Sequence, residues 1–262
     1  SAIKGSLPFV HFFDGFRTSH EVNKVKELND EDLIKLIDFD KVNEFKKRML
    51  NVDAGIQKGM AENEDIYFQS VEARNELYNV MPDIVYNYMK EINKLTGMEY
   101  RPFNYYGCED AENAIVAMGS VCDTVKLVVD DLNNKGYKVG LIEVHLYRPF
   151  SAYYLKKVLP NTVKNIAVLD RTKEAGSIGE PLYLDVIGVL KDTNIKVVGG
   201  RYGLSSKNTT PDQIFAVYEM LREEFKDNFT IGIVDDVTNL SLPKYDYNID
   251  LGAQEIKIFG FG

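Results

Sequence analysis

Three segments of the chain place charged and hydroxyl side chains directly after an apolar run that is predicted to be a strand. Ligands of open α/β sheets bind beyond the carboxyl ends of the strands, so such segments are the first candidates for a binding or catalytic site. The segments are HFFDGFRTSHE (residues 11–21), DRTKEAGSIGEP (170–181) and GGRYGLSSK (199–207). The last two are rich in glycine, as are loops that hold phosphate groups at a helix N-terminus.

The spacing within the two glycine-containing segments argues against phosphate binding. Neither GxGxxG nor GxxxxGK[ST] occurs in them, and Glu174 and Glu180 would repel a phosphate. We therefore predict that residues 170–181 form a turn that caps a helix and places charges at a domain border. Gly203 is expected to supply a positive φ angle, and Arg201 to bind a carboxylate of a neighbouring domain.

The DGFRTSH segment also has a structural interpretation that competes with a functional one. Asp14 and Ser19 are residue types that form turns and cap helices, and Arg17 can pair with a carboxylate. His145 ends a predicted strand, and Pro149 favours an extended conformation at Arg148, so this guanidinium is expected to project toward a partner surface. No nucleophile and base can be paired from the sequence alone.

The cysteines and histidines do not form a metal motif. The chain has two cysteines, Cys108 and Cys122, without a CxxC spacing, and an iron–sulfur cluster needs about four thiolates. The three histidines, His11, His20 and His145, lack the HExxH spacing and every other zinc spacing considered. We predict that this chain binds no metal.

Composition and charge exclude two further classes of function. The chain has 262 residues, of which 45% are hydrophobic and 27% charged, enough for a sizeable core. Its 31 basic and 40 acidic residues give a net charge of −9, which disfavours binding to a nucleic-acid backbone. No stretch approaches the roughly 18 apolar residues of a membrane span, and no signal-peptide pattern opens the chain. These features predict a soluble cytoplasmic protein.

The first hundred residues are predicted to contain one strand followed by helices. LPFVHFFD (7–14) is an apolar and aromatic run typical of a strand buried on both faces. Asp30 is a candidate N-cap for helical residues that continue to Leu50, and residues 51–70 are expected to be an irregular connection. Pro82 fits the first turn of an amphipathic helix that Gly97 ends. The chain thus starts on a strand and is expected to be truncated.

From about Tyr105 to Asp236, short apolar runs alternate with helical stretches. The runs are AIVAMG, VGLIEVHL, NIAVLD, KVVGG and TIGIVDD, and helices are predicted over 120–134, 151–159, 181–190 and 211–224. This alternation is typical of βαβ units around a mostly parallel sheet. The predicted fold class is α/β, a three-layer α/β/α domain with a five-stranded sheet. IKIFGFG (256–262) is expected to be the first strand of a following domain.

Five segments in this order resemble the pyruvate:ferredoxin (or flavodoxin) oxidoreductase family: HFFDGFRTSHE, HLYRPFSA, LDRTKEAGSIGEPLYLDV, GGRYGLSSK and GIVDDVTNLSLP. The resemblance implies that residues 1–103 are the C-terminal part of a thiamine pyrimidine-binding domain. Residues 104–236 would be a domain similar to the C-terminal domain of transketolases, and residues 237–262 a linker with the start of the next domain. Ala175 departs from the proline expected in the family's loop, which bears on loop rigidity.

The family converts pyruvate and coenzyme A to acetyl-CoA and carbon dioxide and passes electrons to ferredoxin or flavodoxin. The resemblance implies that the full-length enzyme is a homodimer that uses thiamine diphosphate, Mg²⁺ and [4Fe–4S] clusters, with coenzyme A as a substrate. The family's GDG-type motif and its cluster cysteines do not occur in this chain, and its pyrimidine-binding glutamate and substrate arginine are expected to lie outside it. We therefore assign no catalytic, cofactor-binding or metal-binding residue here and expect no cofactor in this fragment.

The sequence accordingly predicts a structural and interdomain-contact fragment of such an enzyme, inactive by itself. Two alternatives stay open at this point. The chain could be a free-standing module that captures a small anion, such as coenzyme A, with its two charged strand-end loops. It could also belong to an oxidoreductase that acts on another 2-oxoacid.

Overall fold

The computed structural model describes residues 1–15, 18–20, 22, 26–53, 55 and 61–250. The chain divides into two compact units. The first contains Ser1–Tyr105, Met118–Ser120 and Ile142–Leu159, and the second contains Tyr106–Ala117, Val121–Leu141 and Pro160–Gly262.

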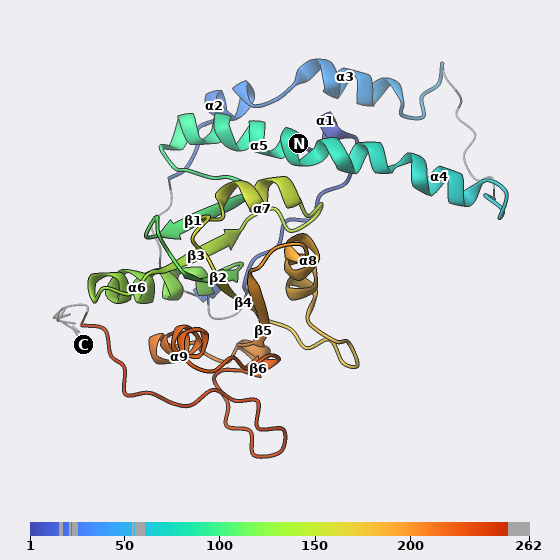
Figure 1. The fold of residues 1–262 in the computed structure, drawn as a ribbon. Helices are drawn as coiled ribbons and strands as arrows, with labels where there is room; N and C mark the ends of the chain where they lie inside the picture. The colour runs from blue at the N-terminus through green and yellow to red at the C-terminus, as the bar shows by residue number, and fades with distance from the viewer. Residues whose placement is uncertain (16–17, 21, 23–25, 54, 56–60, 251–262) are drawn as a thin grey trace, which may run out of the picture. The chain divides into compact units, whose positions relative to one another are not determined.

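Six strands form a single sheet with the order β1-β3-β2-β4-β5-β6 (Figure 1). They are β1 (Phe103–Gly107), β2 (Asn113–Ala117), β3 (Val139–Val144), β4 (Asn165–Asp170), β5 (Lys196–Arg201) and β6 (Phe229–Thr230). The pairs β2–β4, β4–β5 and β5–β6 are parallel. The predicted α/β class with a mostly parallel sheet is confirmed, but the sheet has six strands where five were predicted.

The additional strand is β1, which precedes the first apolar run of the predicted alternation. The start of β1 lies beside the end of β3, where the N–H of His145 donates to Pro102 O, and the end of β1 lies beside the start of β3, where the N–H of Cys108 donates to Val139 O. β1 therefore runs antiparallel to β3. The last predicted strand, TIGIVDD, is mostly wrong, since β6 ends at Thr230 and Gly232 follows with a φ of 83°.

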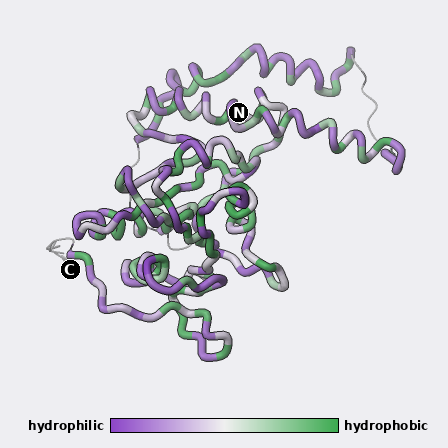
Figure 2. Tube along the Cα trace, in the orientation of Figure 1, coloured by the Kyte–Doolittle hydropathy of each residue, from purple (hydrophilic) through white to green (hydrophobic). Residues whose placement is uncertain are grey.

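The second unit has three layers, as its strand pattern requires. Side chains alternate between the two faces of a strand, and Ile115 and Ala117 of β2 belong to a core shared with the helices α6 (Val121–Asn134) and α9 (Pro211–Arg222). Helix α8 (Pro181–Leu190) packs on β4 and β5 but contributes nothing to that core, so it covers the opposite face. In Figure 2, much of α8 is green, the colour of hydrophobic residues.

The predicted helices of the second half agree with the structure to within two residues at each end. Helix α8 has the predicted bounds, and α9 starts at Pro211, in accordance with the preference of proline for the first turn. Helix α7 (Ala152–Val158), in the first unit, begins after Ser151, whose hydroxyl accepts a hydrogen bond from Tyr154 N. These boundaries follow from capping residues that are local in the sequence.

The first unit also contains the described helices of residues 1–105. They are α1 (Ala2–Gly5), α2 (Asp30–Lys35), α3 (Phe39–Lys47), α4 (Tyr67–Ala73) and α5 (Asn75–Thr96), and η1 (Thr18–His20) is a short 3₁₀ turn. The N-cap of α2 is Asn29, whose side chain accepts from Asp32 N, so the prediction of Asp30 is wrong by one residue. Helix α4 starts inside the segment 51–70 that was predicted to be irregular.

Helix α5 differs from its prediction at one end. Gly97 ends the helix in a left-handed conformation, as expected, but Pro82 lies inside the helix because α5 begins at Asn75. At this position Pro82 lacks the N–H that would bond to the carbonyl of Tyr78, and its ring crowds that carbonyl, so the helix continues through a residue that disfavours it.

The predicted N-terminal strand is wrong. Residues 8–15 form no strand, and Val10, Phe12 and Phe13 are 84%, 62% and 72% exposed. An apolar run becomes a buried strand only where other elements cover both of its faces, and the described residues provide none here. The segment IKIFGFG lies outside the described residues.

Among the helices in the described ranges, none combines the length and the apolar character that crossing a membrane requires.

Candidate functional site

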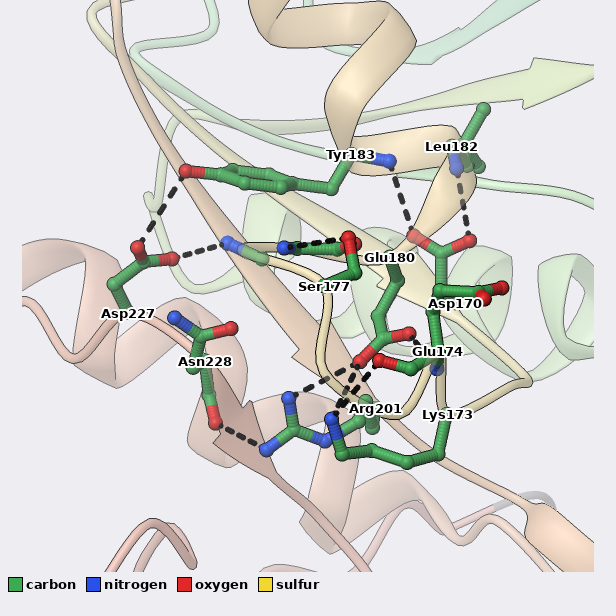
Figure 3. Close-up of polar contacts among 12 residues, drawn as sticks. Asp170, Lys173, Glu174, Ser177, Glu180, Leu182, Tyr183, Arg201, Asp227 and Asn228 are labelled. Atoms are coloured by element: carbon green, nitrogen blue, oxygen red, sulfur yellow. Dashed lines mark hydrogen bonds and ion pairs between the residues drawn. The ribbon is translucent and has the colours of Figure 1, made fainter.

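The carboxyl ends of β4 and β5 carry a cluster of charged side chains in the second unit, which we call the strand-end network (Figure 3). Its members are Asp170, Lys173, Glu180, Arg201 and Asp227. Because ligands of parallel sheets bind at this edge, the network is the first place to test for a functional site.

Asp170 holds the N-terminus of helix α8. It is the last residue of β4 and only 2% exposed, and its two carboxylate oxygens accept the N–H groups of Leu182 and Tyr183, each at 3.0 Å. The N-cap residue Glu180 makes no capping contact with its own side chain, so Asp170 replaces it in that role. The predicted helix-capping function of this loop is confirmed.

The electrostatics of Asp170 combine opposing effects. Burial raises the pKa of its carboxyl group above the ordinary value, and the charges of Glu180 and Asp185 add to this. The hydrogen bonds from Leu182 and Tyr183 act against it, because they stabilise the ionised form. Asp170 is thus a buried carboxylate that is committed to the backbone of α8.

Glu180 and Arg201 form a buried ion pair. Glu180 is 3% exposed and Arg201 8%, and Glu180 Oε1 lies 3.3 Å from Arg201 Nη1 and 3.6 Å from Lys173 Nζ. Glu180 Oε2 accepts the N–H of Glu174 at 2.5 Å, and Arg201 Nη2 donates to the carbonyl of Asn228 at 2.7 Å. The prediction that Arg201 binds a neighbouring domain is wrong, because its carboxylate partner lies in the same unit.

Asp227 completes the network and was missed from the sequence. Its Oδ1 accepts the N–H of Gly199 at 2.8 Å, and the hydroxyl of Tyr183 donates to Oδ2 at 3.4 Å. Burial, and then the charge of Asp227, raise the pKa of the Tyr183 phenol. The only local signal was the Asp227-Asn228 pair before a strand, which is a turn signal that says nothing about distant partners.

The third glycine segment is a turn stabilised from within the unit. Gly203 has a φ of 63°, as predicted, and its carbonyl accepts a hydrogen bond from Arg171 Nε at 3.0 Å. Ser205 and Ser206, in the 3₁₀ turn η2 (Leu204–Ser206), also have positive φ angles of 53° and 58°. This backbone differs from that of a phosphate-binding loop opening a long helix.

The remaining candidates have structural contacts as well. In the first unit, Asp14 Oδ2 accepts the N–H of Ser120 at 2.6 Å, which agrees with a capping type of interaction. His145 Nδ1 lies 2.9 Å from the carbonyl of Arg101. The guanidinium of Arg148 is 4.0 Å from the ring centroid of Tyr147, and Arg148 is exposed, so its orientation toward a partner surface stays a prediction.

Other candidates of the first segment have few described contacts. The ring of His11 lies 6.1 Å from that of Phe13, and Ser19 Oγ is 3.5 Å from His20 Nδ1. Arg17 and Glu21 lie outside the described residues.

The described residues show no arrangement of side chains that would hold a metal ion or an iron–sulfur cluster. No group of three or more His, Cys, Asp or Glu side chains in the described ranges is arranged to hold a metal ion. Neither Cys108 nor Cys122 forms a disulfide, and burial, followed by the nearby Asp110, raises the pKa of Cys108, which disfavours the thiolate that a metal needs. The carboxylates of the strand-end network are occupied by protein donors. These side chains therefore do not fit a metal ion or an iron–sulfur cluster.

The geometry defines an α/β scaffold in which protein groups engage the strand-end charges. Glu180 pairs with Arg201 and Lys173, whereas Asp170 and Asp227 accept backbone N–H groups. Two family models match the chain, "Pyruvate:ferredoxin oxidoreductase core domain II" over residues 111–214 and "Pyruvate flavodoxin/ferredoxin oxidoreductase, thiamine diP-bdg" over residues 1–90. The chain belongs to the pyruvate:ferredoxin/flavodoxin oxidoreductase family, which uses thiamine diphosphate.

The similar proteins are much longer than this chain. It is 50% identical to the pyruvate-flavodoxin oxidoreductase of Enterobacter agglomerans and 51% identical to the pyruvate:ferredoxin oxidoreductase of Moorella thermoacetica, with 100% of this chain and 23% of each of those proteins aligned. The chain thus spans about a quarter of the length of these relatives. Among solved structures, the 2-oxoglutarate:ferredoxin oxidoreductase of Magnetococcus marinus matches with 18% identity and a TM-score of 0.41. The match covers 66% of this chain and 27% of that protein's chain.

Proposed function

We propose that this chain is a scaffold portion of a larger thiamine-diphosphate-dependent enzyme that oxidises pyruvate. The parent enzyme would convert pyruvate and coenzyme A to acetyl-CoA and carbon dioxide and pass the electrons to ferredoxin or flavodoxin. The observation that carries the proposal is the alignment of the entire chain, at about 50% identity, with only 23% of pyruvate:ferredoxin and pyruvate-flavodoxin oxidoreductases.

The domain assignment is part of this proposal. Residues 1–103 would be the C-terminal part of the pyrimidine-binding domain, residues 104–236 the transketolase C-terminal-like domain, and residues 237–262 the linker and start of the next domain. The two family models support a border near residue 100, since one matches residues 1–90 and the other residues 111–214.

The chain contributes no catalytic residue in this proposal. The buried charges Asp170, Glu180 and Arg201 support it, because their polar atoms are engaged by protein groups. Thiamine diphosphate, Mg²⁺ and the [4Fe–4S] clusters would be held by other parts of the parent polypeptide. The chain's role would be to position those parts, and the parent is proposed to be a cytoplasmic homodimer.

A direct activity assay tests the proposal. The purified chain is mixed with pyruvate, coenzyme A, thiamine diphosphate, Mg²⁺ and an electron-accepting dye, with the full-length Moorella thermoacetica enzyme as the positive control. We expect dye reduction by the full-length enzyme and none by the chain. Turnover by the chain itself would overturn the proposal.

The alternative of a free-standing module that binds coenzyme A through its strand-end loops is disfavoured by the contacts of those loops. Lys173 and Arg201 both face Glu180, and Arg171 donates to Gly203, so these cations have internal partners. Calorimetric titration with coenzyme A decides between the two. Micromolar binding that is lost in Lys173→Ala would favour the module, whereas no such binding favours the scaffold.

A further inference from the structure

The first unit contains a cavity that none of the sequence motifs includes. It has a volume of about 360 Å³ and lies between α5, the segment from Glu99 to Tyr105, and α7. This volume falls in the range of pockets that hold small molecules, roughly 300–1,000 Å³. Its wall consists of aromatic rings, two cations, one carboxylate and one amide.

The two cations of the wall are weakly neutralised. Lys157 Nζ lies 5.8 Å from the centroid of the Tyr86 ring and 5.4 Å from that of Tyr153, and no carboxylate of the described residues pairs with it. Arg101 approaches one carboxylate, that of Glu99, at 3.9 Å, and the two side chains are 54% and 83% exposed. An ion pair this long and this exposed contributes little to stability. In a chain with a net charge of −9, this leaves two cations at one cavity that are available to an anion.

A third cation adds to the positive charge beside the cavity. Lys90 Nζ lies 4.9 Å from the centroid of the Tyr86 ring, and no described carboxylate pairs with it. Lys90 and Lys157 therefore both approach the ring of Tyr86, and neither forms an ion pair with a described carboxylate. Asp83 is near, but its Oδ1 accepts the hydroxyl of Tyr154 at 2.6 Å.

The aromatic wall is held in place by contacts between its own rings and with residues behind them. The rings of Tyr86 and Tyr154 are 5.1 Å apart, and Phe103 is fully buried against Phe150 at 5.3 Å. Burial and the hydrogen bond to Asp83 raise the pKa of the Tyr154 phenol, so it stays neutral. Fixed, neutral rings are suited to hold a flat apolar group.

One polar atom of the wall has no partner. Asn104 Oδ1 is buried and makes no hydrogen bond to the described residues, whereas its Nδ2 donates to the carbonyl of Glu99. A buried acceptor without a donor is unfavourable, and Asn104 belongs to the lining of the cavity. An N–H group inside the cavity is therefore a suitable partner for this amide after a small side-chain adjustment.

We propose that this cavity binds a small organic phosphate that carries a planar ring with an N–H donor. The phosphate contacts Lys157 and Arg101, the ring packs on Tyr86 and Tyr154, and the donor faces Asn104. Glu99 moves away from Arg101 when the phosphate arrives, which its high exposure permits. The inference uses contacts of the first unit only and does not depend on the proposed function.

Titration of the full 262-residue chain with adenosine 5′-monophosphate tests the proposal, with inorganic phosphate and adenosine as partial probes. We expect the nucleotide to bind at least about tenfold more tightly than either partial probe, because each probe uses only one side of the cavity. Phosphate binding as strong as nucleotide binding would overturn the proposal, and so would the absence of nucleotide binding at millimolar concentration.

Two lysines on α7 provide a matched pair of variants. Lys157→Ala removes a cation from the cavity wall, and Lys156→Ala removes the same charge from an exposed position of the same helix that does not line the cavity. We expect Lys157→Ala to weaken nucleotide binding by about ten- to a hundredfold, the size of a charged hydrogen bond, and Lys156→Ala to leave it within about twofold. Equal effects of the two variants would refute a specific site. Circular dichroism establishes that both variants are folded.

Tyr86→Leu tests the aromatic wall separately. It keeps an apolar side chain but removes the flat face of the ring. We expect the preference for nucleotide over inorganic phosphate to fall by about tenfold, in line with the energy of base–aromatic stacking. An unchanged preference would show that the ring does not contact the base.

Discussion

Replacing Asp170 by alanine tests whether a single buried carboxylate organises the carboxyl end of the sheet. The change removes the acceptors of two N–H groups at the start of α8, those of Leu182 and Tyr183, which are 0% and 7% exposed. A buried N–H without an acceptor costs about 1–3 kcal/mol, and the loss of a helix cap about 0.5–2 kcal/mol. Because water can replace part of the contact at Tyr183, we expect a total loss of about 2–4 kcal/mol.

Urea unfolding followed by circular dichroism measures this effect. With a slope of about 2 kcal/mol per molar urea, the midpoint of Asp170→Ala should fall by about 1–2 M. Asp170→Asn keeps one carbonyl oxygen as an acceptor and should lose about half as much. Asp192→Ala, which removes an exposed carboxylate just beyond α8, should stay within about 0.5 kcal/mol. A midpoint of Asp170→Ala equal to that of the unchanged chain would refute the capping role.

Three further predictions concern the same unit. Glu180→Gln leaves the buried guanidinium of Arg201 without a countercharge and should reduce the free energy of unfolding by about 3–5 kcal/mol. The control Glu174→Gln, in the same loop, should change the free energy of unfolding by less than about 0.5 kcal/mol. Equal urea midpoints of the two variants would contradict this. Gly203→Ala should destabilise the folded chain by about 1 kcal/mol, because Gly203 has a φ of 63°. Gly188→Ala, in open space within α8, should stabilise the folded chain by about 0.5–1 kcal/mol. Thermal melting checks that the two variants shift the melting temperature in opposite directions. Burial raises the pKa of Asp170 above 3.8, so the native state binds this proton more tightly than the unfolded chain does. The titration of Asp170 therefore stabilises the native state most at low pH, and this contribution is lost as the pH rises through the folded pKa. A carboxyl titration by ¹³C NMR measures the pKa, and a value at or below 3.8 would contradict this.

Local patterns were sufficient for the helices of the second half of the chain and for strands β3, β4 and β5. Pro181 and Pro211 mark the starts of α8 and α9, and Gly97 marks the end of α5, because proline at the first turn and glycine after the last turn act on the backbone of their own neighbours. The same patterns were insufficient near the N-terminus, where LPFVHFFD has the composition of a buried strand but is exposed. Composition measures the tendency to be buried and carries no information about which element covers the segment.

The charged loops show the same limit at the level of side chains. The sequence by itself established the α/β class, the family resemblance and the absence of phosphate-loop and metal spacings, since all of these depend on order and spacing along the chain. Only the tertiary structure decided that Arg201 pairs with Glu180, that Asp227 binds Gly199, and that β1 joins the sheet as an antiparallel strand. These contacts join residues that are 21 or more positions apart, and which distant groups meet is decided when the sheet and its helices pack.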